Sequence, residues 1–518
     1  MTEIFAADQI GFPILAVMIL LPLLIAVALY FIPTAAQQRT VAMAGALVEL
    51  LLGLIVLWVF EPGAADAQLA QKAQWIPTLG SSFHLGVDGV SVLFLPLTAF
   101  VILLAMVCGG NVAASSSRLY LANLLFLMAA AIGVYVSLDL VLFFLFWEAM
   151  LIPSYFLIRM WGVGPARQSA AMKYVLYMLI GSVPLLIAIA ALGANLGTLD
   201  LLELQTTDIP MPLQTTAFLL LFLAFAVKAP LPPFHTWLPQ VAMEGPAGIA
   251  IFLVGLKLGT FAMIKVLLPI APDVALAWQP VLIWIGIVAM LYGGFIALAQ
   301  TNMRRMLAYA SVSHVGMVVA GIFTLSASGL QGSVMAMVNM GLASTVLMLL
   351  AGSLQQRLGT TELTRLGGIA RQAPLMAVAF FIAGLASIGM PGTSGFQGEF
   401  AILSGVFNGG YLMGAVALFG VILGAGYILW FYERAFFGPV TSTDVSHIRD
   451  IGGREGWVVC AALVLVMAVG IAPMSAIKTV SGTTDNMSAT LNQTPASQTA
   501  ERSDDTLEQK RLLLSDKS

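Results

Sequence analysis

Residues 218–239 read FLLLFLAFAVKAPLPPFHTWLP, an apolar stretch that runs into Lys228 and a cluster of prolines. A helix that crosses a lipid bilayer needs roughly 20 mainly apolar residues. Proline removes a backbone N–H donor and breaks a helix. Backbone groups that are freed at membrane depth are tolerated only where protein or a water-filled cavity satisfies them. The stretch therefore predicts a membrane helix that is interrupted beside an internal polar site.

The composition of the whole chain agrees with a membrane protein. Of its 518 residues, 60% are hydrophobic and 9% charged, and the mean hydropathy is +0.97. Soluble proteins carry about 25% charged residues, so a water-soluble enzyme is excluded. The net charge of −3 gives no sign of the basic surface that binds nucleic acid. Cys108 and Cys460 lie in apolar runs and are expected to be buried, and the four histidines lack metal-binding spacing. We expect no metal and no redox cofactor in this chain.

Apolar runs of membrane-spanning length recur along the sequence. We therefore expect an all-α polytopic membrane protein with about 14 transmembrane helices, embedded in a lipid bilayer. The runs fall near 11–31, 40–60, 89–109, 118–137, 139–162, 171–194, 214–240, 247–268, 280–299, 306–325, 332–354, 373–408, 411–432 and 456–477.

A second interruption, MPGTSGFQGE at 390–399, lies in the twelfth run. Interrupted helices in corresponding positions indicate an internal repeat with a site at the breaks. The breaks are five helices apart, so the predicted repeats are helices 4–8 and 9–13, and an odd-numbered repeat must be inverted across the membrane. The expected organisation is helices 1–3 at 1–110, a first repeat at 111–270, a second repeat at 271–432, a cytoplasmic loop and helix 14 at 433–478, and a polar, largely disordered tail at 479–518.

Lysine and arginine predict the orientation. With 14 helices, most loop arginines fall on one face, and the internal loops of the other face hold only Lys72 and Lys265. The positive-inside rule then places both termini on the non-cytoplasmic side. Lys265 is expected to extend outward to the membrane surface. Within the first long loop of the non-cytoplasmic face, Trp75–Leu85 is expected to form a small hairpin.

Charged residues inside the predicted membrane helices are the candidate functional residues. Glu148, Lys228, Lys257 and Glu399 each cost roughly 2.5–3.5 kcal/mol at the bilayer centre, so such residues usually pair, line water or carry protons. Glu and Lys can both release a proton when their surroundings change, whereas Arg stays charged. The alternative is a buried ion pair that fixes helix packing. His314, in the tenth helix, can relay a proton through its two ring nitrogens or can be a hydrogen-bonded core residue.

Two further polar residues in these runs favour structural roles. Glu49 stands alone in the second helix, and we expect it to make a hydrogen bond between helices. His235 follows the helix 7 break among prolines. Capping and an interface role are equally compatible with that position.

Several segments together resemble one known family over about 75–455. The resemblance is to the antiporter-like subunits of the respiratory complex I superfamily, and it is closest to the subunit M branch of bacterial NADH:quinone oxidoreductase. The segments are WIPTLG at 75–80, FHLGVDG at 83–89, FWE at 146–148, VKAP at 227–230, HTWLP at 235–239, LK at 256–257, AYASVSHVG at 308–316 and GFQGEF at 395–400.

The resemblance implies 14 helices, two inverted five-helix repeats and a row of charged residues at mid-membrane across which protons move. Position by position, Glu148 resembles the helix 5 glutamate of the family, Lys228 the helix 7 lysine and Lys257 the helix 8 lysine. His314 resembles the helix 10 histidine, and Glu399 the helix 12 residue, which is Glu in subunit M and Lys in subunits L and N.

The same resemblance implies the place of the chain in an assembly. The chain would be a non-redox subunit of a proton-pumping enzyme in the bacterial inner membrane, next to other membrane subunits. FMN, iron–sulfur clusters and quinone would be held by partner subunits.

Two departures from subunit M keep other branches open. The helix 7 motif continues as LPQVAMEGP at 238–246, where subunit M usually has Leu-Pro-Asp-Ala-His. Met340 stands where the family commonly has a histidine in helix 11. The alternatives are a subunit of a multi-subunit Na⁺/H⁺ antiporter, the membrane half of an inorganic-carbon uptake module, and a scaffold that transports nothing.

Overall fold

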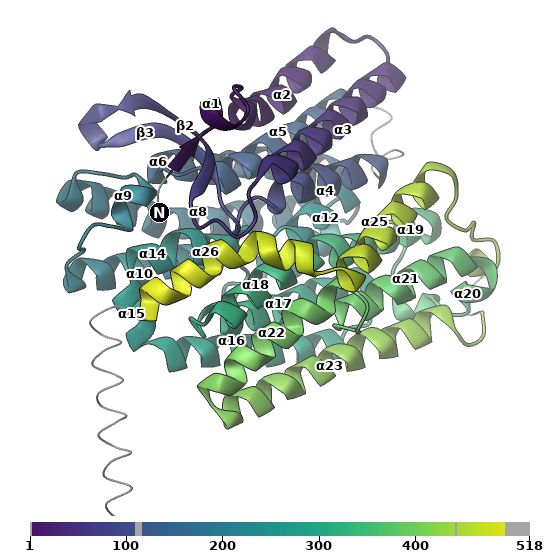
Figure 1. Cartoon of the computed structure of the whole chain (residues 1–518). Coiled ribbons are helices and arrows are strands. Elements are labelled where there is room, and N and C mark those ends of the chain that lie inside the picture. The colour runs from purple at the N-terminus through teal and green to yellow at the C-terminus, as the bar shows by residue number, and fades with distance from the viewer. Residues whose placement is uncertain (1–2, 109–116, 441–442, 493–518) are drawn as a thin grey trace, which may run out of the picture.

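The computed structural model describes residues 3–108, 117–440 and 443–492, which form a bundle of long helices with a small sheet on its outside (Figure 1). Among these residues, 12 helical segments are long and apolar enough to cross a membrane, and each lies within or overlaps one predicted run. Shorter apolar helices, Phe94–Val107 and Pro374–Ser387, fall in the third and twelfth runs. The all-helical membrane fold is therefore confirmed. The count of 14 crossings and the inverted repeat stay predictions.

Uninterrupted helices make up much of the bundle. They are α2 (Ile14–Ala28), α3 (Ala35–Val59), α4 (Phe94–Cys108), α5 (Ser117–Val136), α8 (Arg167–Leu196), α16 (Gln279–Leu298), α17 (Met303–Ile322), α23 (Tyr411–Phe436), α25 (Gly453–Ile471) and α26 (Met474–Asn492). Short helical turns connect them: α1 (Ala6–Gln9), α9 (Leu201–Leu204), α14 (Leu268–Ile270), α15 (Pro272–Ala277), α20 (Ile369–Gln372) and α24 (Thr443–Ser446), with the 3₁₀ turns η1 (Leu29–Phe31), η2 (Pro77–Leu79) and η5 (Leu363–Arg365).

The remaining helices are interrupted. Both predicted breaks are confirmed: α10 (Met211–Lys228) is separated from α11 (Trp237–Glu244), and α21 (Pro374–Ser387) from α22 (Ser394–Gly409). The chain also breaks between α12 (Ala247–Gly255) and α13 (Leu258–Ala262), where no proline stands. A short break also separates α6 (Leu140–Ala149) from α7 (Leu151–Trp161). Two π-helical turns occur as well: η3 (Met263–Leu267) follows α13, and η4 (Met340–Ser344) lies between α18 (Ala327–Asn339) and α19 (Thr345–Leu358).

The sheet confirms the predicted hairpin and extends it. Strand β2 (Ala67–Ile76) pairs antiparallel with β3 (Ser81–Val87), with Lys72 opposite His84, and β1 (Glu3–Phe5) adds to β2 in parallel. His84 Nδ1 and Lys72 Nζ lie 2.7 and 2.9 Å from Asp200 Oδ2, just before α9. Burial acts to raise the pKa of Asp200, but the hydrogen bonds and charges of His84 and Lys72 outweigh it and lower the pKa to about 2. These contacts attach the sheet to the bundle.

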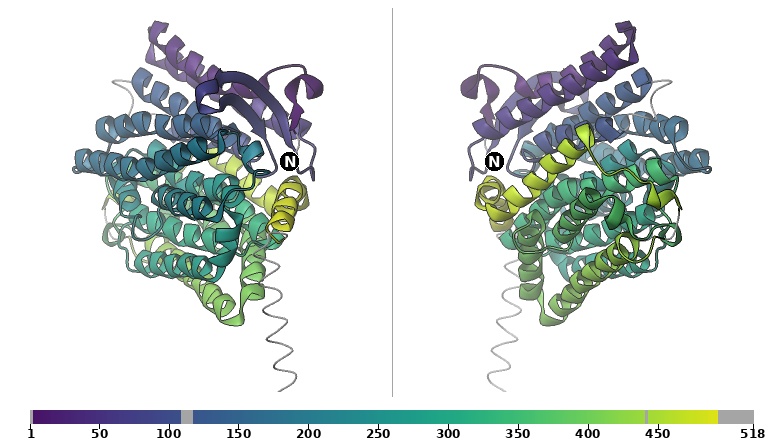
Figure 2. Two further views of the ribbon diagram at one scale, coloured as in Figure 1. Left: turned by 90° about the vertical axis from the view of Figure 1, so that its left-hand side faces the viewer. Right: turned by 90° about the vertical axis from the view of Figure 1, so that its right-hand side faces the viewer.

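The predicted disorder of the tail from residue 479 is wrong as far as residue 492. Helix α26 covers Met474–Asn492 and lies beside the N-terminal sheet end of the bundle (Figure 2). Its buried face carries hydroxyl side chains, and Thr479 and Thr484 donate to carbonyls of their own helix. A polar sequence therefore packs as a helix because its polar groups are satisfied internally. The rest of the predicted tail, 493–518, lies outside the described residues.

Two predictions about burial are also wrong. Cys460 is exposed on the outer surface of α25, not buried. Lys265 is buried in η3, where its ammonium group forms an ion pair with Asp88. Asp88 precedes α4 and accepts hydrogen bonds from the backbone N–H groups of Val90 and Ser91. The lysine therefore secures the beginning of α4 and does not extend to the membrane surface.

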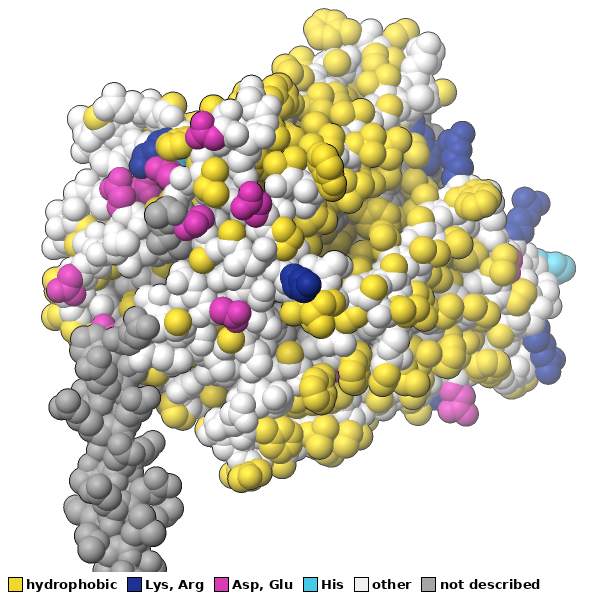
Figure 3. Space-filling model, in the orientation of Figure 1, with side chains coloured by type: hydrophobic (Ala, Val, Ile, Leu, Met, Phe, Trp, Pro, Cys, Tyr) yellow, Lys and Arg dark blue, Asp and Glu magenta, His cyan; other side chains and the backbone are white. Residues whose placement is uncertain are grey.

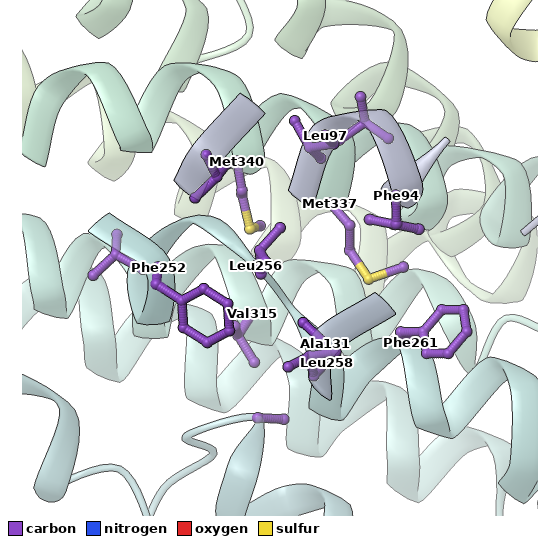
Figure 4. Close-up of a cluster of buried hydrophobic side chains, with 14 of the residues drawn as sticks. Phe94, Leu97, Ala131, Phe252, Leu256, Leu258, Phe261, Val315, Met337 and Met340 are labelled. Atoms are coloured by element: carbon purple, nitrogen blue, oxygen red, sulfur yellow. The ribbon is translucent and has the colours of Figure 1, made fainter. Parts of the chain in front are cut away.

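The core of the molecule surrounds the break in the eighth membrane run. Nearly every residue of the spans Ala247–Ile270, Met303–Ile322 and Ala327–Leu358 is buried, whereas Gly453–Ile471 is mostly exposed. Figure 4 shows Leu256 and Leu258, the neighbours of Lys257, in a cluster of apolar side chains with Met337 and Met340. Lys257 and His314, the candidate residues on these helices, therefore lie at the apolar centre of the bundle.

Candidate functional site

Glu148 and Lys228 are linked through Trp147, which precedes Glu148 on α6 and contacts Lys228. Lys228 is the last residue of α10, and its Nζ donates to the backbone oxygen of Trp147 at 2.9 Å and lies 3.9 Å from the centre of the Trp147 ring. Glu148 follows on α6 and accepts a hydrogen bond from Ser182 Oγ of α8. In the part of the chain that the structure describes, no ion pair within 4.0 Å joins Glu148 to Lys228. The carboxylate and the lysine are thus neighbours with separate hydrogen-bond partners.

Lys257 occupies the break between α12 and α13. Its backbone has φ −106° and ψ 58°, outside the helical region, and its side chain is 5% exposed. The ammonium group donates to the backbone oxygen of Val254 and to Ser311 Oγ, the latter at 2.7 Å. The carbonyl end of a helix carries partial negative charge, so the end of α12 favours a cation at this position.

Helix α17 contributes the next polar residues beyond Lys257, which are Ser311 and His314. Ser311 and His314 are one turn apart and therefore lie on one face of the helix. His314 is buried, its Nε2 lies 3.5 Å from Tyr427 Oη on α23, and its Nδ1 has no hydrogen-bond partner among the described residues. Tyr427 is fully buried as well. The histidine therefore has one ring nitrogen beside a hydroxyl group and the other available.

Glu399 lies beside the break between α21 and α22. The carboxylate is 8% exposed and packs against Gly389, whose φ is +64°. A Cβ atom at Gly389 would lie 2.3 Å from a carboxylate oxygen of Glu399, so a side chain there would displace the carboxylate, and the positive φ favours glycine at this position. Asn339 of α18 fixes the two sides of this break, because it donates to Ala386 O at 3.0 Å and accepts from Ser394 Oγ at 2.7 Å.

Close backbone contact brings the two lysine-bearing breaks together. Gly259, near the start of α13, packs directly on the residue after Lys228: a Cβ at Gly259 would lie 2.4 Å from the backbone nitrogen of Ala229. Lys228 and Lys257 therefore sit at two interrupted helices that touch each other. The structure thus brings together the half-buried Glu148 and Lys228, and the buried Lys257 and His314.

Several hydrogen-bond partners of these residues could not be predicted from the sequence. Ser182, Ser311, Tyr427 and Asn339 are ordinary polar residues in apolar runs, and the sequence does not show which helix each one faces. Only Ser311 carries a signal, because it stands one turn before His314. Trp147 belongs to a recognisable motif, but its role as the acceptor for Lys228 depends on the packing of α6 against α10.

Glu49 and His235 lie outside this set of contacts. Both carboxylate oxygens of Glu49 are buried without a hydrogen-bond partner in the described parts of the chain, so the predicted helix–helix hydrogen bond is not formed there. His235 is buried after the helix 7 break, and its Nε2 lies 3.2 Å from Tyr292 Oη.

The arrangement suits proton exchange better than metal or nucleophilic chemistry. Carboxylates, lysines, a histidine and a tyrosine alternate at the centre of an apolar bundle, and each can gain or lose a proton. Within residues 3–108, 117–440 and 443–492, no group of three His, Cys, Asp or Glu residues is placed to hold a metal ion.

Comparison with known proteins identifies the family. The family described as NADH:quinone oxidoreductase/Mrp antiporter, transmembrane, matches residues 137–424, more than half of the chain. This chain belongs to the NADH:quinone oxidoreductase/Mrp antiporter family. The matched region contains all five predicted site residues: Glu148, Lys228, Lys257, His314 and Glu399.

Individual members of the NADH:quinone oxidoreductase/Mrp antiporter family align over nearly the full chain. NADH-quinone oxidoreductase subunit M of Rickettsia conorii is 34% identical over 488 residues, which cover 92% of this chain and 98% of the relative. Subunit M of Mycobacterium tuberculosis is 33% identical, with 93% and 95% covered. The departure at Met340 is accommodated in the apolar cluster of Figure 4, where a methionine side chain fills space between helices.

Solved structures confirm the fold. A chain of respiratory complex I from Thermus thermophilus superposes with a TM-score of 0.84 at 30% identity, covering 92% of this chain and 99% of that one. A chain of the Mrp complex from Dietzia superposes with a TM-score of 0.81 at 23% identity, covering 92% and 97%. Because the Mrp complex chain is only 23% identical, its similarity supports the fold alone.

Proposed function

We propose that this chain is a proton-translocating membrane subunit of NADH:quinone oxidoreductase that performs no redox chemistry itself. The observation that carries the proposal is the row of Glu148, Lys228, Lys257 and Glu399, each at or beside a helix break. Lys257 and Glu399 are buried, and Glu148 and Lys228 are half-buried. The relatives named subunit M and the matching complex I chain support the assignment to this assembly.

The mechanism begins at Trp147. The Lys228 ammonium of α10 contacts Trp147, and Glu148 is the next residue on α6, with its carboxylate bonded to Ser182 of α8, so a small shift of α6 or α10 changes the separation of carboxylate and ammonium. Drawing Glu148 away removes the attraction that favours a charged lysine, and Lys228 then gives up its proton.

The second stage lies between Lys257 and Glu399. A proton that reaches Lys257 is transferred through water molecules and the side chains of Ser311 and His314 to Tyr427, and from there to Glu399. From Glu399 it leaves on the non-cytoplasmic side. The two touching breaks at Ala229 and Gly259 provide the mechanical link between the two stages.

The driving energy comes from partners. Moving one charge against 100 mV costs about 2.3 kcal/mol. In our proposal this energy comes from redox chemistry in partner subunits and not from this chain. FMN, iron–sulfur clusters and quinone are held by partner subunits, and the chain lies among other membrane subunits in the bacterial inner membrane, with both termini outside the cytoplasm. Purification from native membranes with identification of the co-purifying proteins tests this: flavin and iron–sulfur subunits are expected, and their absence contradicts the assignment.

Replacing Lys228 by Met tests the mechanism. Methionine is a similar unbranched side chain, one atom shorter, that holds no proton, so NADH-driven proton pumping by membrane vesicles should fall to background while the complex still assembles, as judged by native gel electrophoresis. Lys478→Met, at an exposed lysine of α26, is the matched control and should pump normally. Normal pumping by an assembled Lys228→Met complex would contradict the proposed role.

Sodium/proton antiport is the second candidate function. The helix 7 sequence at 238–246 departs from subunit M, and the fold is shared with the Mrp complex chain. Transport that requires Na⁺ and proceeds without NADH would favour this candidate. Transport that requires NADH and is indifferent to Na⁺ would favour the complex I assignment.

A further inference from the structure

An open groove of about 790 Å³ runs along the outer surface between α21 and α25. Leu375 and Val378 of α21 form one wall, and Trp457, Cys460 and Val464 of α25 contribute to the other. These side chains are exposed although most are strongly apolar. The groove therefore suits an apolar occupant.

The length of the groove matches one leaflet of a bilayer. On α25 the lining residues extend from Gly453 to Ala468, which at 1.5 Å per residue is about 22 Å. The hydrocarbon core of a bilayer is about 30 Å thick, so one leaflet contributes about 15 Å and the headgroup zone the remainder. An acyl chain with its headgroup fits this span.

Uncompensated positive charge gathers at one end of the groove. Among the described residues, the arginines without a hydrogen bond, an ion pair or a ring contact from their side chains are Arg305, Arg371, Arg449 and Arg454. Arg371, Arg449 and Arg454 all lie where α21 and α25 begin, next to lining residues, and all are exposed. In Figure 3, Lys and Arg gather at this edge of the molecule and most Asp and Glu at the opposite edge.

The acidic residues of the same region are already engaged. Asp450 accepts the backbone N–H groups of Leu375 and Met376 at 2.7 and 2.9 Å, and so caps α21. Glu455 forms an ion pair with Arg357 at 2.6 Å. Glu455 is therefore already neutralised, and the single charge of Asp450 can offset only one of the three arginines, which leaves a net positive charge at this end of the groove.

We propose that this groove binds one anionic phospholipid, with an acyl chain between α21 and α25 and its phosphate against Arg371, Arg449 and Arg454. Basic pockets between membrane helices on the cytoplasmic side favour anionic headgroups, and arginine binds phosphate through paired hydrogen bonds. An apolar helix of a neighbouring subunit would fill the groove but would leave the arginines without a counter-charge. The proposal is independent of proton transfer by this chain.

Photocrosslinking of the assembled complex in vesicles tests the proposal. The probes are phosphatidylglycerol and phosphatidylcholine that carry the same diazirine-labelled acyl chain, and labelled peptides that contain residues 457–468 are quantified by mass spectrometry. We expect phosphatidylglycerol to label this segment several-fold more than phosphatidylcholine. Each arginine replaced by Gln should lower this preference, and the triple variant should be labelled equally by both lipids, because each basic residue adds attraction for an anionic membrane lipid.

Two variants make the result decisive. Arg305→Gln, which removes an exposed arginine away from the groove, should leave the preference unchanged. Val464→Trp fills the groove with a bulky side chain and should suppress labelling by both lipids. Equal labelling by the two lipids, a preference that survives the triple arginine variant, or crosslinks to a neighbouring protein in place of lipid would each overturn the proposal.

Discussion

At the scale of single residues, the two central lysines are held by different kinds of acceptor. Lys228 donates to a backbone oxygen and lies over an aromatic ring, whereas Lys257 donates to a helix-terminal oxygen and to a serine hydroxyl. A hydroxyl group can both accept and donate a proton, and a backbone oxygen can only accept. In the proposed pathway, Ser311 is therefore the residue through which a proton would leave Lys257 toward His314.

Ser311→Ala tests this role of the serine. The variant removes the hydroxyl acceptor from a charged donor, a loss of about 1.5–3 kcal/mol, which corresponds to a rate lower by roughly tenfold or more. NADH-driven pumping in vesicles should fall by that factor in a fully assembled complex. Ser333→Ala is the matched control, because Ser333 is buried and bonds only to backbone oxygens. Equal rates in the two variants would remove Ser311 from the pathway.

At the scale of elements, interrupted helices position the site. The breaks after α10 and α21 follow from prolines and glycines that are visible in the sequence, so both are predictable from it. The break at Lys257 has no proline. Its cause is tertiary: α13 must start where Gly259 can press against Ala229 at the end of α10. Contact between two elements therefore creates the third break.

Gly259→Ala should disturb this contact. The added methyl group would lie 2.4 Å from the backbone of Ala229, so α10 and α13 must move apart, and overpacking of this kind costs about 1–3 kcal/mol. We expect less of the variant chain to remain in solution after heating of detergent-solubilised membranes, together with slower pumping.

Gly426→Ala provides the control for that experiment. Gly426 lies in α23, and a methyl group added to its Cα would have no other atom within 4 Å, so the substitution meets open space. The heat stability of this variant should equal or slightly exceed that of the unchanged chain, because alanine favours a helix more than glycine does. Similar stability of both alanine variants would show that the α10–α13 contact is not tight.

At the scale of the whole molecule, the two ends of the bundle differ in their structure and in their charge. The sheet and α26 lie together at one end, and the arginine-rich connections before α21 and α25 lie at the other (Figures 1 and 3). The positive-inside rule predicts that the arginine-rich end faces the cytoplasm. In that orientation the headgroup of the proposed phospholipid would lie in the cytoplasmic leaflet.

Cysteine labelling tests the orientation. In a background with Cys108 and Cys460 replaced by Ser, Gln74→Cys in β2 and His447→Cys beyond α24 put single thiols at exposed positions near the two ends. A membrane-impermeant maleimide should label residue 74 on intact cells and residue 447 only after the cells are permeabilised. The reverse pattern would invert the topology and with it the proposed direction of proton release.

The sequence by itself determined the membrane class, the position of most helices, the breaks at prolines and the identity of the charged residues. These features depend on the chain's own backbone hydrogen bonds and on the cost of burying charge in lipid. The tertiary structure alone decided the break at Lys257, the partners Ser311 and Tyr427, and the pairing of Lys265 with Asp88. It also decided the helix formed by the polar segment after residue 474. Each of these depends on residues distant in sequence, whose approach is set by how the helices pack.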